Sequence, residues 1–142
     1  MDIKEISEIT PNIVRALHKL ISQLSSSAFL PSENDLKQIV DDHKNTLFVA
    51  EKDGKILGCL TLIVFRIPTG VRAWIEDVVV DKNERGKGIG KELCHTAIEK
   101  ARKLGARTVD LTSRPDREAA NCLYQKLGFT KRETNVYRYL VK

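Results

Sequence analysis

Residues 78–91 read Val-Val-Val-Asp-Lys-Asn-Glu-Arg-Gly-Lys-Gly-Ile-Gly-Lys, and the fold assignment begins with them. The three valines close an apolar run, Val71–Asp81, that predicts a central strand. Apolar residues at helical spacing predict a helix over Ile89–Leu104, ended by Gly105. Glycines between a strand and a helix let a ligand approach the backbone, and the first helical turn offers unpaired N–H groups. The segment therefore predicts a site for an anion such as a diphosphate.

Four cations flank this glycine turn: Lys82, Arg85, Lys87 and Lys91. The competing interpretation is an ordinary strand-to-helix turn with exposed basic side chains. Two established phosphate-binding patterns do not fit. The dinucleotide pattern G-x-G-x-x-G requires glycine at position 91, which is lysine, and the sequence has no Walker pattern G-x-x-x-x-G-K-[ST]. Enzymes that hydrolyse nucleotides or transfer hydride are thus disfavoured.

Hydrophobic periodicity and turn signals on either side of the glycine turn predict an α/β fold, with one mixed sheet flanked by helices. The expected order is strand, helix, helix, three strands, helix, strand, helix, strand. No Pro-, Gly- or Ser-rich linker interrupts residues 1–142, so we expect a single domain. The other elements are expected at Asp2–Ser7, Pro11–Leu24 (helix), Ser32–Asp42 (helix), Thr46–Glu51, Lys55–Phe65, Ala106–Ser113, Asp116–Leu127 (helix) and Phe129–Val141.

The composition is that of a globular domain, with 42% apolar residues and a net charge of +5. Residues 1–81 carry 9 basic and 12 acidic side chains, whereas residues 82–142 carry 15 basic and 7 acidic ones. The second part should therefore attract a polyanion, either nucleic acid or a phosphorylated small molecule. No apolar run approaches the ~20 residues of a membrane helix. The start lacks a secretory pattern, and the three cysteines cannot all pair, so we expect a cytoplasmic protein that does not act at a membrane.

Three motifs carry a resemblance to a known family. Arg85-x-x-Gly88-x-Gly90, after Val78-Val79-Val80, resembles the acetyl-CoA pyrophosphate motif of the GNAT superfamily of N-acetyltransferases. Tyr124-Gln125-Lys126-Leu127-Gly128-Phe129 is similar to the later helix-to-strand signature of that superfamily, at the right separation. Trp74-Ile75-Glu76-Asp77-Val78 is similar to a strand of glucosamine-6-phosphate N-acetyltransferases. The likeness is strongest over residues 74–129 and weak over the first 45.

The resemblance implies a GNAT-like domain that uses acetyl-CoA as acetyl donor and transfers the acetyl group directly to a primary amine in a ternary complex. Backbone groups of Val78, Val79 and Val80 would bind the pantetheine arm, and an N–H there would polarise the thioester carbonyl. The pyrophosphate would be held by the motif of Arg85 and by the backbone of Gly86, Lys87, Gly88, Ile89, Gly90 and Lys91. The family often places an asparagine where this chain has Arg117, and Asn121 is expected to replace it.

Two catalytic residues are expected. Tyr124 matches the family's tyrosine that acts as general acid or stabilises the thiolate, although a tyrosine in an apolar helical stripe is also typical of a core. Glu76 and Asp77 are adjacent on a strand, so their side chains should point to opposite faces and only one should face the acceptor. We expect Glu76 to accept the amine proton, directly or through water. The alternatives are a solvent-facing carboxylate, a carboxylate paired with Arg72 or Arg114, and an amine that arrives already deprotonated.

The acceptor is expected to be a small-molecule or peptide amine that contacts the first two helices, residues 22–31 and the turn at residues 66–70. An acetyl-CoA sensor without catalysis is an alternative. A nucleic-acid-binding module is a weaker alternative, because aromatic residues make up only 6% of the chain and do not interleave with basic ones.

Residues 134–139 are expected to form a terminal strand at which a second copy of the chain can pair. Three cysteines are expected to be buried thiols, at positions 59, 94 and 122. Three histidines are expected at the surface, at positions 18, 43 and 95.

Overall fold

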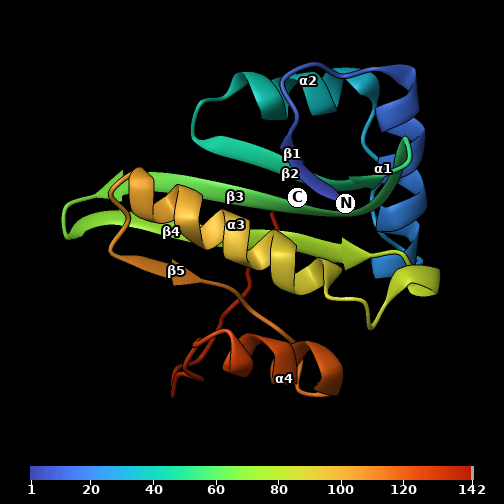
Figure 1. Cartoon of the computed structure of the whole chain (residues 1–142). Helices are drawn as coiled ribbons and strands as arrows, with labels where there is room; N and C mark the ends of the chain where they lie inside the picture. The colour runs from blue at the N-terminus through green and yellow to red at the C-terminus, as the bar shows by residue number, and fades with distance from the viewer. Residues whose placement is uncertain (142) are drawn as a thin grey trace. The chain divides into compact units, whose positions relative to one another are not determined.

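A computed structural model describes residues 1–141 of the chain (Figure 1). The chain groups into two compact units, Met1–Thr112 and Ser113–Lys142. The first unit contains the sheet and three of the α-helices, and the second contains the fourth α-helix. The single domain expected over residues 1–142 stays a prediction.

Five strands form one sheet in the order β1-β2-β3-β4-β5. Neighbours from β1 to β4 are antiparallel, whereas β4 and β5 pair in parallel. The strands are β1 Asp2–Glu5, β2 Asn45–Lys52, β3 Lys55–Ile67, β4 Gly70–Val80 and β5 Thr108–Asp110. Both residues of the turn between β2 and β3, Asp53 and Gly54, have positive φ, as the Asp-Gly hairpin signal requires. The mixed α/β architecture expected from the sequence is confirmed.

Helices cover both faces of the sheet (Figure 1). Helices α1 (Pro11–Leu24) and α2 (Glu33–Asp41) contact one face, and α3 (Ile89–Lys103) contacts the other. Successive residues of β3 show this division, because side chains alternate between the faces of a strand. A Cβ atom on Gly58 would lie 3.1 Å from the Leu93 side chain of α3. The next residue, Cys59, packs in the cluster under α1 and α2.

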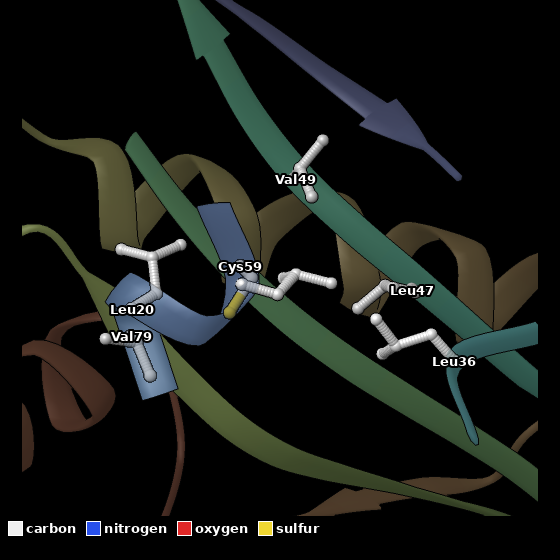
Figure 2. Packing of buried hydrophobic residues seen from close by; sticks show 7 residues of the cluster. Leu20, Leu36, Leu47, Val49, Cys59 and Val79 are labelled. Carbon is white, nitrogen blue, oxygen red and sulfur yellow. The ribbon is translucent and has the colours of Figure 1, made fainter. Parts of the chain in front are cut away.

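This cluster holds α1 and α2 on the sheet. Figure 2 shows Leu20 of α1 near Cys59 and Val79, and Leu36 of α2 close to Leu47. These side chains are all buried. Each buried Leu or Val contributes roughly 1.5–3 kcal/mol by leaving water, so the two helices are firmly attached over β2, β3 and β4.

The Ser113–Lys142 unit contains α4 (Glu118–Lys126) and an irregular segment after it. The strand expected over Phe129–Val141 is not formed by the described residues, and Val136, Tyr137 and Tyr139 are 74–89% exposed. The alternating aromatic residues are compatible with a β-strand. A segment becomes a strand, however, only where a neighbouring strand forms hydrogen bonds with its backbone. This expectation was wrong for the single chain, and the pairing with a second copy stays a prediction.

Candidate functional site

A β-bulge lies near the end of β4. Cys59 of β3 pairs with Val79, and Thr61 pairs with Glu76, so two residues of β4, Asp77 and Val78, lie opposite one residue of β3. Asp77 has a φ of 51°, which is uncommon outside glycine. The extra residue bends the strand and interrupts its side-chain alternation.

The bulge interrupts the simple alternation of faces at Glu76 and Asp77 that the sequence analysis assumes. Glu76 pairs with Thr61, and directly paired residues share a face. Thr61 and Asp77 both line a cavity on the face under α1 and α2. Glu76 accepts a hydrogen bond from Trp74 Nε1 and is not among the residues that line the cavity. Asp77 thus belongs to the lining, and its charge acts on the thiol of Cys59, another lining residue. The role of Glu76 as the base stays a prediction.

One edge of β4 is open beside the bulge. Strand β5 pairs only with Arg72, Ala73 and Trp74, near the start of β4. Within residues 1–112, β4 continues from residue 75 to residue 80 without a β5 partner. Unpaired N–H and C=O groups along a strand edge can bind an extended ligand as an additional strand would. Val78, Val79 and Val80 lie on this part of β4, as a site for an extended arm requires.

The glycine turn follows directly. Gly86 and Gly88 have φ values of 79° and 84°, a left-handed backbone that favours glycine, and a Cβ atom at either position would have no neighbour within 4 Å. Gly88 is the N-cap of α3, and no side chain caps this helix end. The first N–H groups of α3 therefore have no side-chain cap, and the positive end of the helix dipole lies at this turn. This arrangement fits a diphosphate.

The cations of the turn differ in their contacts. Arg85 Nε donates to the Val80 carbonyl at 3.2 Å, which holds the turn against the end of β4. Lys87 forms an ion pair with Glu84 at 2.7 Å. Lys82 and Lys91 are exposed. The turn thus presents positive charge beside backbone N–H groups, which is the charge pattern expected from the sequence.

Asp81 connects this turn to α1, a role not anticipated from the sequence. Asp81 is buried, with only 5% of the residue exposed. The carboxylate accepts from Asn83 N at 3.1 Å and pairs with Lys19 Nζ of α1 at 3.2 Å. The Asn83 N–H holds the pKa of Asp81 below its usual value, opposed by burial and assisted by Lys19. Gln23 of α1 accepts from Lys82 N at 2.8 Å, a second link between helix and turn.

A cavity of about 620 Å³ lies between α1, α2 and the sheet. Most of its lining is apolar, including Leu17, Ile21 and Leu36, and Phe29 joins it from the loop between the helices. Burial, and secondly the charge of Asp77, raises the pKa of Cys59 to about 12, so this thiol stays protonated at neutral pH. Four residues of the expected acceptor segment 22–31 line the cavity, whereas residues 66–70 do not: Leu24, Ala28, Phe29 and Pro31. Their contact with an acceptor stays a prediction.

The loop beside the cavity is tied to α1. His18 Nε2 donates to the Pro31 carbonyl at 2.5 Å. Ser32 and Asp35 form a capping box at the start of α2. These contacts fix the C-terminal end of the segment that carries Phe29.

In the Ser113–Lys142 unit, Tyr124 is buried in α4 and contacts Phe129 edge to face, with ring centroids 5.9 Å apart. Asn121 Nδ2 donates to the carbonyls of Arg114 and Arg117, both at 2.9 Å, which leaves the amide oxygen for a ligand. Cys122 is exposed, contrary to expectation, because it lies two residues, about 200° of helical turn, from buried Tyr124. Cys59 and Cys94 are buried as expected. The roles of Tyr124 and Asn121 toward acetyl-CoA stay predictions.

Within residues 1–141, no helix has both the length and the apolar character that a membrane span requires. The same range contains no group of three or more His, Cys, Asp or Glu side chains placed to hold a metal ion.

The sheet, the open edge of β4 and the glycine turn define an acetyltransferase fold, and the chain belongs to the GNAT acetyltransferase family. The family described as "Acetyltransferase (GNAT) family" matches residues 14–129, and this family uses acetyl-CoA as its acetyl donor. A putative acetyltransferase from Agrobacterium tumefaciens has the same fold, with a TM-score of 0.88 over 99% of this chain and 100% of that one at 23% identity.

Two curated relatives are similar to this chain in sequence. An uncharacterised N-acetyltransferase of Methanocaldococcus jannaschii is 34% identical over 100 residues, 68% of this chain and 44% of the relative. A probable glucosamine 6-phosphate N-acetyltransferase of Oryza sativa subsp. japonica is 32% identical over 133 residues, 84% of this chain and 77% of the relative. The chain spans about half the length of several curated relatives, 44%, 59% and 47% of three of them.

Proposed function

We propose that this chain is an N-acetyltransferase that moves the acetyl group of acetyl-CoA to a primary amine by direct attack in a ternary complex. One observation carries the proposal. The open edge of β4 runs from the bulge at Asp77, beside the cavity, to the glycine turn at Gly86 and Gly88. A single strand thus connects a site for an anion with a site for a second molecule.

The donor is proposed to lie along this strand. Backbone N–H groups from Gly86 to Lys91 would hold the pyrophosphate, and the open edge at residues 78–80 would bind the pantetheine arm. A backbone N–H on this edge would stabilise the negative charge that develops on the thioester oxygen. Acetyl-CoA supplies the activated acyl group.

Residues of the chain would accept and donate the protons that this reaction transfers. The amine nitrogen forms a bond to the acyl carbon while the carbon–sulfur bond breaks, so the nitrogen must lose one proton and the leaving sulfur must gain one. Asp77 is the exposed carboxylate beside the cavity, and we propose that it accepts the amine proton, directly or through water. Tyr124 is proposed as the proton donor to sulfur on the strength of its motif.

Ligand binding and CoA release test this function. We expect acetyl-CoA to raise the melting temperature of the full chain, whereas NADH and duplex DNA should leave it unchanged. In a panel of amines, at least one should release free CoA from acetyl-CoA. Binding without release for every amine would favour the sensor, and stabilisation by DNA alone would favour the nucleic-acid module.

A further inference from the structure

We infer that the acceptor is a small primary amine carried on an apolar, uncharged carbon skeleton, such as an arylalkylamine. This inference rests on the proposed function and narrows it to one substrate class. It also excludes phosphorylated amino sugars, the acceptors that the names of some relatives suggest.

The charge of the cavity carries the first step. Among the residues that line it, the charged ones are Asp35 and Asp77, and no Lys or Arg contributes. Two lysines of the covering helices form ion pairs outside the cavity lining, Lys19 with Asp81 at 3.2 Å and Lys37 with Glu33 at 4.0 Å. A phosphate in this cavity would lose its hydration without gaining an opposite charge, which is unfavourable.

The two carboxylates are not equivalent. Asp35 Oδ2 accepts the Ser32 N–H at 2.9 Å within the capping box, so its charge already stabilises the start of α2. Asp77 lies beside Cys59, whose thiol stays neutral at physiological pH. Asp77 is therefore the anion available to an incoming ammonium group, at the bulge where the strand edge opens.

The walls of the cavity decide what else the amine carries. α1 contributes Leu17, Ile21 and Leu24, and α2 contributes Leu36 and Ile39. Gln38, Asn45 and Thr61 also line the cavity, but Asn45 Nδ2 already donates to the Ile39 carbonyl at 3.2 Å. The apolar walls gain free energy by covering apolar surface, and the few polar residues cannot pair with all the hydroxyl groups of a sugar. An aminoglycoside or a polyamine would leave several polar groups unpaired there, whereas an aromatic or branched alkyl body would not.

Phe29 gives the cavity an aromatic rim. It lies on the loop between α1 and α2, lines the cavity and is 77% exposed. The loop is held near its end by the His18–Pro31 hydrogen bond, so the ring stays beside the opening. An apolar acceptor would cover this ring. The volume of about 620 Å³ lies within the roughly 300–1,000 Å³ of small-molecule sites.

Initial rates of CoA release from the full chain test the inference. The acceptors are 2-phenylethylamine, glucosamine 6-phosphate, an aminoglycoside and the tripeptide Phe-Gly-Gly. We expect kcat/KM for 2-phenylethylamine to exceed that for each of the others by about tenfold or more. A higher kcat/KM for glucosamine 6-phosphate, the aminoglycoside or the tripeptide would overturn the inference.

A variant pair tests the role of the rim. Phe29→Ala should raise KM for 2-phenylethylamine several-fold and leave the affinity for acetyl-CoA unchanged. Phe29→Leu keeps an apolar side chain, so its KM for 2-phenylethylamine should lie close to that of the wild type. Leu30→Ala is the matched control, because Leu30 is the neighbouring exposed apolar residue and does not line the cavity. Equal KM values for Phe29→Ala and wild type would contradict the inference.

Calorimetry separates failure of this inference from failure of the proposed function. Saturable binding of 2-phenylethylamine, weakened by Phe29→Ala, would support the inference even without acetyl transfer. Absence of such binding, together with CoA release onto another amine, would overturn the acceptor class and leave the acetyltransferase proposal standing. Absence of acetyl-CoA binding would instead overturn the proposed function.

Discussion

Gly88 is the residue at which local geometry and the proposed chemistry are most closely linked. Its φ of 84° is strained for any other residue, and open space surrounds it. We expect Gly88→Ala to destabilise the chain by about 1–2 kcal/mol and to weaken acetyl-CoA binding, because the N–H groups of the turn shift. Urea denaturation and calorimetry measure the two effects.

Gly105→Ala is the matched control for this prediction. Gly105 has a φ of 85° and open space around it, but it lies after the far end of α3. Its substitution should cost similar stability and leave the affinity for acetyl-CoA unchanged. If both variants bound acetyl-CoA as wild type does, the glycine turn would not be the diphosphate site.

Asp81 makes the stability of the chain depend on pH. Its pKa is lower in the folded chain than in the unfolded one, so its contribution is present above the unfolded pKa of about 3.9 and is lost as the pH falls through the folded value. Asp81→Asn should reduce the free energy of unfolding by about 1–3 kcal/mol at pH 7. The difference from wild type should shrink toward pH 3. Asp41→Asn, at an exposed position of α2, should leave the urea midpoint nearly unchanged.

The three cysteines should differ in reactivity. Burial raises the pKa values of Cys59 and Cys94 to about 12 and about 11, so both are protonated and shielded at pH 7.5. Cys122 is exposed. Brief treatment of the folded chain with iodoacetamide should modify Cys122 alone, as peptide mass spectrometry can show. Rapid modification of Cys59 would contradict its packing under α1.

At the scale of elements, the segment from residue 25 to residue 32 positions the cavity rim, and the capping box at its end is a local contact. The Ser32 side chain accepts from Asp35 N at 3.0 Å and starts α2. We expect Ser32→Ala to cost about 1 kcal/mol of stability, the usual effect of removing an N-cap. A melting curve measures this loss. Ser26→Ala in the same loop is the control and should change the melting temperature little.

Strand β4 shows how far the sequence could predict an element. The valines, the glycines and the cations predicted strand, turn and helix, since these signals are local. The bulge at Asp77 was not predictable, because it depends on the register between β4 and β3, and it lies where Asp77 joins the cavity lining. The apolar alternation after α4 predicted a strand, yet strands need a partner that the alternation does not specify.

At the scale of the whole molecule, the uneven distribution of charge between residues 1–81 and residues 82–142 can be compared with the structure of residues 1–112. The exposed cations Lys82 and Lys91 belong to the glycine turn, whereas the charged residues of the cavity are acidic. A phosphate-bearing donor and an ammonium-bearing acceptor would thus meet opposite potentials on either side of the bulge. Acetyl-CoA binding should therefore weaken as salt concentration rises, because exposed charges are screened.

The most direct test of the account is an initial-rate matrix in which acetyl-CoA and the best amine of the panel are varied together. Direct attack in a ternary complex predicts that CoA release requires both substrates and that double-reciprocal lines intersect. Parallel lines would indicate an acyl-enzyme that forms before the amine binds. Parallel lines, or no amine-dependent release of CoA at all, would contradict the central claim.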